Sequence, residues 1–442
     1  MKRPAVVGSM AVVAAVLVVA AGYGAYKLHL FNRSSTQRGE VASTNEAEPG
    51  GSQRRHGPPA WPIFRFDERR TGNNPAANLR PPLRIRWLRD APNHSYLEAP
   101  PVVARGVLVA VSYTRYRGSD IVAVNAQTGR TLWHRHYRQG EIFASTPAIA
   151  GAEVYVTSKD GHLRVFDLRS GRLRWQKVLR GDATESTPIV SRGLVYFGRA
   201  NGYMYAFDVR RRRLIWRFGP TGGNVASGVA LTATTAYFAS YGGGVYGLNR
   251  FTGRLRWKTV VRGARDNLVP FYSTPALARG RVLLGGNDGS VYALDARTGA
   301  QKWRFDAEGY VYASAAIRGG RLYIGDFGGG FHALSIKTGR EIWRHQMGPI
   351  LGSATVIRNV VYVSSLRPSR TVGLDPDTGR VVWRFRDGQF SPVIADDDEA
   401  WLGGRTRFYA LRAAPRPARR AGRGRAHRRP SHRRGPWSAG WP

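Results

Sequence analysis

Cysteine is absent from all 442 residues of the chain. This absence excludes a disulfide framework and a zinc site built on thiolates. It also excludes a lipid anchor attached to an N-terminal cysteine. The stability of the fold must therefore come from packing and hydrogen bonding rather than from covalent cross-links.

Acidic residues and lysine are scarce. Asp and Glu number 29 against 68 Lys and Arg, the net charge is +39, and only seven of the basic residues are Lys. Such a charge favours anionic partners such as lipid, wall polymer or nucleic acid. The preference for Arg over Lys favours a coding bias instead for the central region. For the tail at 412–442, which has ten Arg and no acidic residue, an anionic polymer or lipid stays open as a partner, and the tail is expected to be disordered.

Charge is also missing from residues 5–26, a run of 22 positions. A helix of this length spans a hydrocarbon core of about 30 Å, so the sequence predicts a transmembrane signal anchor. A cleaved signal peptide is the alternative, although its apolar region is usually only about 7–15 residues long. Lys2 and Arg3 favour a cytoplasmic N-terminus. The predicted location is the cell membrane, with a single span and the rest of the chain outside the cytoplasm.

Composition and repeats divide the chain into five predicted regions. A cytoplasmic stub and the anchor come first, followed by a polar, disordered linker and a lead-in segment. The repeats come next, and the Arg-rich tail is last. The boundaries are 1–31, 32–60, 61–82, 83–411 and 412–442.

One phrase recurs seven times between the lead-in and the tail, and "VYALDARTGAQKW" is an example of it. The Trp residues that end successive copies lie 42, 41, 41, 46, 40 and 40 positions apart. A period of this kind indicates a repeat architecture. The seven residues are Trp133, Trp175, Trp216, Trp257, Trp303, Trp343 and Trp383.

Local physical chemistry explains each copy. "VYALD" favours a buried strand because it is apolar and rich in β-branched and aromatic residues. Asp295 ends this strand, and its carboxylate can accept backbone N–H groups of the following turn. Gly299 suits a turn position with positive φ, and the turn delivers the strand that carries Trp303. About forty residues with four short strands predict one antiparallel blade of a β-propeller.

The small and large residues of each copy fit the geometry of a propeller. Blades radiate from an axis, so small first strands such as "STPAIA" suit the crowded centre, and each Trp is predicted to be a wedge between blades at the periphery. The segment "LRIRW" supplies an eighth wedge, Trp87, and "RFYAL" at 407–411 ends without a Trp strand. The N-terminal strand at 83–88 is therefore predicted to complete the last blade. The result is an all-β, eight-bladed ring without open edges.

The phrase A-x-D-x-x-T-G-x-x-x-W resembles the tryptophan repeat of the quinoprotein (PQQ-repeat) eight-bladed propellers. The lead-in "WPIFRFDERRTGNN" at 61–74 resembles the segment that precedes these propellers. The resemblance implies either a PQQ-dependent dehydrogenase or a member of the non-catalytic, BamB-like branch. One copy departs from the pattern, because Arg211 and Arg212 occupy the Thr and Gly positions. A left-handed non-Gly residue costs about 1–2 kcal/mol, so this turn must change shape or bear strain.

The predicted ring has two different faces. The loops after the second and fourth strands of each blade open on one face, here called the funnel face, and the repeat turns open on the other, the turn face. Aromatic and acidic residues precede the inner strands on the funnel face and are the predicted partner-binding residues. They are Glu141, Phe143, Glu185, Asp266, Tyr272, Tyr310, Tyr312 and Phe390. Ordinary packing at the rim is the alternative interpretation.

No catalytic or metal site is predicted. The ten His lack the spacing of zinc ligands, and the run "ADDDE" at 395–399 points neighbouring carboxylates in different directions. The dehydrogenases of the family build their sites from long insertions between blades, for which these repeats leave little room. The sequence therefore favours a membrane-anchored, non-catalytic, monomeric scaffold without a cofactor. Its partner is a protein or cell-envelope component, and a PQQ-dependent dehydrogenase or a small-ligand sensor is the alternative.

Overall fold

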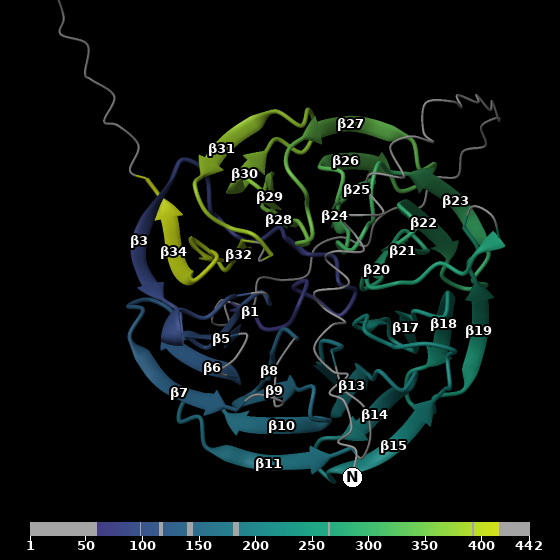
Figure 1. The fold of residues 1–442 in the computed structure, drawn as a ribbon, viewed down its shortest axis with the longest axis horizontal. Coiled ribbons are helices and arrows are strands. Elements are labelled where there is room, and N and C mark those ends of the chain that lie inside the picture. The colour runs from purple at the N-terminus through teal and green to yellow at the C-terminus, as the bar shows by residue number, and fades with distance from the viewer. Residues whose placement is uncertain are drawn as a thin grey trace, which may run out of the picture. The chain divides into compact units, whose positions relative to one another are not determined.

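Eight antiparallel sheets lie around one axis in the computed structural model (Figure 1). The structure describes residues 60–414 except 98, 115–117, 139–144, 180–184, 264–265 and 391–392. The predicted anchor at 5–26, most of the linker and nearly all of the tail lie outside the described residues. Among the residues that are described, no helix is long and apolar enough to cross a membrane. The prediction of an all-β, eight-bladed propeller is confirmed.

The first four blades follow the chain in order, and each runs from a short inner strand to an outer strand that carries the repeat Trp. Blade 1 contains β4 (Val102–Ala104), β5 (Val107–Thr114), β6 (Gly118–Asn125) and β7 (Thr131–Tyr137). Blade 2 contains β8 (Ala148–Ala150), β9 (Glu153–Thr157), β10 (His162–Asp167) and β11 (Leu173–Val178). Blade 3 contains β12 (Ile189–Ser191), β13 (Leu194–Gly198), β14 (Met204–Asp208) and β15 (Arg213–Phe218). Blade 4 contains β16 (Ala230–Leu231), β17 (Thr235–Ala239), β18 (Gly244–Asn249) and β19 (Leu255–Val260).

The other four blades repeat this order, and the last one takes its outer strand from the N-terminal side. Blade 5 contains β20 (Ala276–Ala278), β21 (Arg281–Gly285), β22 (Ser290–Asp295) and β23 (Gln301–Asp306). Blade 6 contains β24 (Ala316–Arg318), β25 (Arg321–Gly325), β26 (Gly330–Ser335) and β27 (Glu341–Gln346). Blade 7 contains β28 (Thr355–Ile357), β29 (Val360–Leu366), β30 (Ser369–Leu374) and β31 (Val381–Phe385). Blade 8 contains β32 (Ile394–Ala395), β33 (Glu399–Gly403), β34 (Arg407–Ala413) and β3 (Leu83–Asp90).

The N-terminal strand β3 closes the ring, as predicted. It pairs antiparallel with β34, from Leu83 opposite Ala413 to Asp90 opposite Arg407. Figure 1 shows the two strands side by side, β3 in blue-violet and β34 in yellow. A short 3₁₀ helix, η1 (Pro92–His94), then leads the chain toward blade 1. Closure therefore depends on pairing between the first and last parts of the propeller.

Each repeat turn receives the Trp of the preceding blade. Trp216 of blade 3 donates its indole N–H to the carbonyl of Arg250 in the turn of blade 4, at 3.0 Å. The glycine of that turn, Gly253, has φ +71°, and a Cβ built on it would lie 2.8 Å from the Trp216 ring. The interface between two neighbouring blades is here called a seam. At six seams, the Trp of one blade contacts both a carbonyl and the glycine of the next blade's repeat turn. They are Trp87/Gly129, Trp133/Gly171, Trp216/Gly253, Trp257/Gly299, Trp303/Gly339 and Trp343/Gly379.

The repeat turn that lacks glycine keeps the left-handed conformation. Arg212 has φ +52°, so this turn bears the strain rather than changing shape. Its guanidinium carbon lies 5.9 Å from the centre of the Trp175 ring of the preceding blade. A cation–π contact thus occupies the place where glycine meets the indole in other seams.

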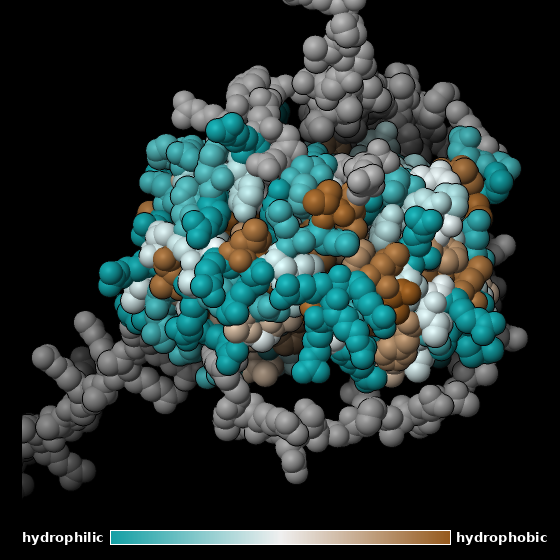
Figure 2. All heavy atoms as spheres, turned by 90° about the horizontal axis from the view of Figure 1, so that it is seen from below, coloured by the Kyte–Doolittle hydropathy of each residue, from teal (hydrophilic) through white to brown (hydrophobic). Residues whose placement is uncertain are grey.

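The outer strands expose Arg and scattered apolar residues. In β11, Trp175 is buried toward the next blade, while Leu173 and Arg174 are exposed. Figure 2 views the ring from the side and shows hydrophilic residues over most of this surface, with hydrophobic residues in separate patches. Charged side chains on an outer strand discourage pairing with another sheet edge.

The lead-in joins the inner strands of the blades near the axis, where Figure 1 shows it in purple. Its strands β1 (Ala60–Trp61) and β2 (Asn73–Asn74) pair with β4 of blade 1 and β28 of blade 7. Between them, lead-in carbonyls accept inner-strand N–H groups at 2.7–2.9 Å. The pairs are Ile149 with Pro62, Leu231 with Glu68, Leu277 with Arg69, Ile317 with Thr71 and Val356 with Gly72.

Polar side chains of the lead-in complete its contacts with the blades. Glu68 accepts the Arg250 guanidinium at 3.2 Å and the hydroxyl of Ser191 in blade 3. Asn74 donates to the carbonyl of Ala395 in blade 8 at 2.8 Å. Arg70 is fully buried and donates to the Val229 carbonyl at 2.8 Å, and burial lowers its pKa to about 9. The lead-in therefore contacts all eight blades and satisfies inner N–H groups that would otherwise lack partners.

Candidate partner-binding face

Four tyrosines form a continuous cluster on the funnel face. Tyr241 lies in the loop between β17 and β18, Tyr272 precedes β20, and Tyr310 and Tyr312 precede β24. Ring centres are 6.4 Å apart for Tyr241 and Tyr272, 5.9 Å for Tyr272 and Tyr312, and 6.1 Å for Tyr312 and Tyr310. All three contacts are edge-to-face, the geometry that the ring quadrupole favours.

Backbone hydrogen bonds hold the loops that carry these tyrosines. The N–H of Tyr241 donates to the carbonyl of Asn224, and the N–H of Phe327 donates to the carbonyl of Tyr310, both at 2.9 Å. In the blade between them, Asn287 N–H donates to the carbonyl of Pro270 at 3.0 Å. Each bond ties the loop after the second strand to the loop before the first strand of the same blade. The aromatic cluster is therefore carried by braced loops.

Two tyrosine hydroxyls of the cluster, those of Tyr241 and Tyr312, have raised pKa values and stay neutral at physiological pH. Burial raises the pKa of Tyr241 to about 12, with smaller contributions from Tyr312 and Glu185, while a hydrogen bond with the Asn287 side chain lowers it. Burial also raises the pKa of Tyr312. Glu185 forms an ion pair with Lys159 at 3.0 Å. The cluster thus offers uncharged hydroxyl and ring surfaces beside a compensated charge pair.

Two buried amide oxygens beside the cluster lack hydrogen-bond partners among the described residues. They are the Oδ1 atoms of Asn224 and Asn287, and the buried Ser273 hydroxyl is also unpaired there. Buried polar atoms of this kind are uncommon, because each costs free energy unless something pairs with it.

The structure brings together only part of the predicted set. Tyr272, Tyr310 and Tyr312 are in contact, and Glu185 lies near enough to influence Tyr241. Asp266 is exposed and pairs with Arg262 at 3.1 Å. Phe390 is half-buried, and its carbonyl packs against Gly352, which precedes the inner strand of blade 7. Glu141 and Phe143 lie outside the described residues.

Tyr241 was missed as a site residue in the sequence analysis. It begins the segment "YGGG", which forms a tight turn between β17 and β18. The available signal was its place after a second strand, because such loops open on the same face as Tyr272. An aromatic residue in that loop could therefore have been assigned to the funnel face.

The described residues do not fit a quinone cofactor with its metal ion. Such chemistry needs a Ca²⁺ held by several oxygen ligands and a carboxylate base. Within the described ranges, no group of three or more His, Asp or Glu is placed to hold a metal ion. The acidic run at 396–398 forms the loop between β32 and β33, and Asp397 and Asp398 are exposed. No step of a reaction is therefore assigned to the funnel face.

The acidic loop makes stability depend on pH. Burial raises the pKa of Asp396 from 3.8 to about 7, and the neighbouring Asp398 and Asp397 add to the shift. As pH rises, the Asp396 carboxyl therefore ionises in the unfolded chain before it does so in the folded chain. The free energy of unfolding falls between about pH 4 and about pH 7. Asp396→Asn retains an Oδ1 acceptor for the Glu399 N–H, a bond of 3.3 Å, without the charge.

We expect Asp396→Asn to raise the free energy of unfolding at pH 8 by about 1–2 kcal/mol, a value reduced for partial exposure. At pH 4 the difference should shrink to a few tenths of a kcal/mol, because folded Asp396 is then neutral and the unfolded group is only partly ionised. Urea unfolding at the two pH values measures the difference. An equal change at both values would show that ionisation of Asp396 is not the cause.

Comparison with known proteins shows the family of the chain. A model of the family described as outer membrane protein assembly factor BamB matches residues 84–218 and 200–414. The chain belongs to this family. It is also 32% identical over 111 residues to the quinohemoprotein alcohol dehydrogenase ADH IIB of Pseudomonas putida. That match covers 23% of this chain and only 15% of the dehydrogenase.

Solved structures with the same fold include both enzymes and other propellers. The quinohemoprotein alcohol dehydrogenase from Comamonas testosteroni aligns with a TM-score of 0.69 and 15% identity over 81% of each chain. BamB from Moraxella catarrhalis aligns with a TM-score of 0.61 and 16% identity, over 75% of this chain and 99% of BamB. The computationally designed Ika8 protein aligns with a TM-score of 0.61 and 17% identity, over 72% of this chain and 96% of Ika8. At these identities the likeness shows the fold alone.

Proposed function

We propose that this protein is a membrane-anchored, non-catalytic propeller that binds a protein or cell-envelope component through its funnel face. The observation that carries the proposal is the cluster of Tyr241, Tyr272, Tyr310 and Tyr312. Tyrosine is enriched in binding interfaces because it offers a large contact area, a polar hydroxyl and little conformational entropy to lose. Glu68 of the lead-in pairs with Arg250 of a repeat turn, on the face opposite this cluster.

Membership of the BamB family supports a binding role. A PQQ-dependent dehydrogenase is the second candidate, favoured by the 111-residue match to ADH IIB. A small-ligand sensor is the third. Among the described residues, no group of His, Asp or Glu is placed to hold the metal ion that a quinone enzyme needs, and this favours the scaffold over the dehydrogenase.

Site-specific photo-crosslinking tests the proposed face. A photoreactive amino acid at Tyr272 should yield one discrete crosslinked protein from cells, because this ring is 39% exposed at the centre of the cluster. The matched control is Phe251, which is also 39% exposed but lies in a repeat turn on the turn face. The same adduct from both positions, or none from Tyr272, would contradict the assignment of the funnel face.

Quinone binding separates the first two candidates. Purified propeller, incubated with PQQ and Ca²⁺, should neither bind the quinone stoichiometrically nor reduce a dye with alcohols or aldose sugars. Binding with substrate-dependent turnover would establish the dehydrogenase and remove the scaffold proposal.

The anchor is tested by membrane extraction. The full chain should stay in the membrane pellet after a carbonate wash, because 22 uncharged residues can span the hydrocarbon core. A chain that begins at residue 33 should be released into the supernatant. A mature native N-terminus near residue 22 would show instead that the segment is a cleaved signal peptide.

A further inference from the structure

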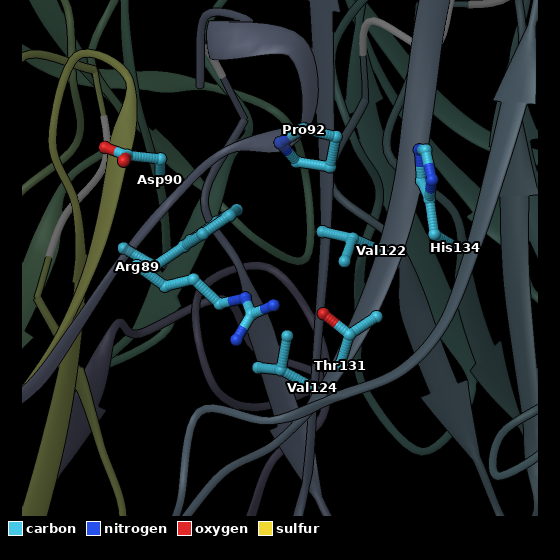
Figure 3. Close-up of a pocket in the computed structure, with 8 residues that line it drawn as sticks. Arg89, Asp90, Pro92, Val122, Val124, Thr131 and His134 are labelled. Carbon is cyan, nitrogen blue, oxygen red and sulfur yellow. The ribbon is translucent and has the colours of Figure 1, made fainter.

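A cavity of about 160 Å³ lies at the seam where the closing strand meets blade 1. Figure 3 shows its lining. β3 contributes Arg89, η1 contributes Pro92, β6 contributes Val122 and Val124, and Phe408 of β34 also lines it. Residues from both sides of the ring closure therefore share one hollow, far from the tyrosine cluster of the funnel face.

The cavity exists because this seam lacks large side chains that fill the next one. Positions in different blades are matched by their distance from the repeat Trp. By this count, Val124 corresponds to Phe166 of blade 2, and Ala91 corresponds to Tyr137 of blade 1. In the seam between blades 1 and 2, Phe166 stacks on Trp133 at 6.2 Å and meets Tyr137 edge-on at 6.5 Å. Replacing two such rings by Val and Ala leaves the space open.

A second substitution enlarges the same hollow. Val122 corresponds to Arg164 of blade 2, whose guanidinium covers the Tyr137 ring at 5.0 Å in the filled seam. Val122, Val124 and Phe408 are each at most 4% exposed, so their side chains form an apolar wall. The space is close to that of an engineered cavity of about 150 Å³ that takes up benzene.

Cationic and hydroxyl groups stand at the mouth of the cavity. Figure 3 shows the Arg89 guanidinium reaching toward Thr131 and Val124, with His134 at another wall and the Asp90 carboxylate turned away. One guanidinium nitrogen of Arg89 donates to the Gly129 carbonyl at 3.1 Å, and Arg89 has further donors. The Asp90 carboxylate, which also belongs to the lining, is engaged by Arg407 at 2.9 Å rather than by Arg89.

Buried Asp120 fixes the position of His134. Its Oδ1 lies 2.7 Å from His134 Nε2 and 2.9 Å from His136 Nδ1, and the side chain is 1% exposed. His134 is thus held as a wall of the cavity rather than free to fill it. The hollow combines an apolar floor of fixed size with an Arg at its entrance.

We propose that this seam cavity binds a small monocarboxylate with a single-ring apolar body. The ring packs against Val122, Val124 and Phe408, and the carboxylate pairs with the Arg89 guanidinium, a geometry that suits two parallel hydrogen bonds. Such a ligand contacts β3 and β34 on one side and β6 on the other. Its binding therefore stabilises the closure of the ring.

Benzoate is the probe, and the full chain is the test protein. We expect benzoate at ten times its dissociation constant to raise the melting temperature by roughly 2 °C, because it binds only the folded ring. Hydrogen exchange should slow in β3 and β6 and stay unchanged in β18 of blade 4. No shift at any millimolar concentration, or equal protection of β18, would overturn the proposal.

Two variants and one control define the site. Val124→Phe copies Phe166 and fills the hollow, so it should fold with at least the wild-type melting temperature and lose the benzoate shift. Arg89→Met should lose the shift with benzoate and keep a smaller one with benzyl alcohol. Arg135→Met, at the matching position of the filled seam, should respond as wild type does. A benzoate shift that persists in Val124→Phe places binding elsewhere, and one that persists in Arg89→Met overturns the carboxylate assignment.

Discussion

Replacing residues 83–88 by six glycine and serine residues will open the ring. The replacement keeps the lead-in attached but removes most of the outer strand of blade 8 and its wedge, Trp87. The Trp87 indole is partly buried and donates to Ala126 of blade 1 at 3.0 Å, so its loss costs somewhat less than the about 3–5 kcal/mol of a fully buried Trp. We expect the melting temperature to fall by roughly 5 °C or more, with aggregation through the exposed edge of β34.

The matched control is truncation after residue 414. It removes the basic tail but leaves β34 paired with β3, so the melting temperature should stay within about 1 °C of wild type, the usual range for a change outside packed structure. Calorimetry and light scattering measure both variants. An unchanged melting temperature for the strand replacement, or unfolding on loss of the tail, would show that the ring is not closed by β3.

Gly253→Ala is expected to destabilise the seam between blades 3 and 4 by about 2–4 kcal/mol. Part of the cost comes from a left-handed φ of +71°, which an L-residue adopts at a cost of about 1–2 kcal/mol. The rest comes from the new methyl group, which would lie 2.8 Å from the Trp216 ring and overpack the seam. Denaturant unfolding gives the difference in free energy.

Gly280→Ala separates the two contributions. Gly280 has φ +67° and no atom within 4 Å of a built Cβ, so its substitution should cost only the backbone part, about 1 kcal/mol. Equal losses at both positions would show that the Trp216 contact contributes nothing. A double-mutant cycle with Trp216→Phe should return part of the loss at Gly253, because the smaller ring gives space to the methyl group.

The candidate site was harder to predict than the fold. Tyr272, Tyr310 and Tyr312 were found because each precedes an inner strand on the predicted funnel face. The same rule also selected Asp266, which pairs with Arg262, and Phe390, whose carbonyl packs against Gly352. Strand order assigns a residue to a face of the ring but does not fix its contacts within the loop. Tyr241 was missed because the segment "YGGG" reads as an ordinary hairpin turn, and its contact with Tyr272 forms only between neighbouring blades.

The lead-in shows a different limit of sequence reasoning. Its residues have no periodicity, and its carbonyls bind N–H groups of inner strands that are distant in the sequence. Glu68 and Arg70 look like ordinary surface residues in the sequence. Their partners, Arg250 and the Val229 carbonyl, come near only when the ring has closed around the axis.

By itself, the sequence determined the blade, the number of copies and the closure by the N-terminal strand. It could do so because the strand, the Asp-capped turn and the Trp strand are local features repeated about every forty residues. Only the tertiary structure decided that each repeat glycine accommodates the Trp of the preceding blade. It also decided that Val122 and Val124 leave a cavity at one seam. Both depend on packing between blades, where the fit of one side chain is set by residues of another copy.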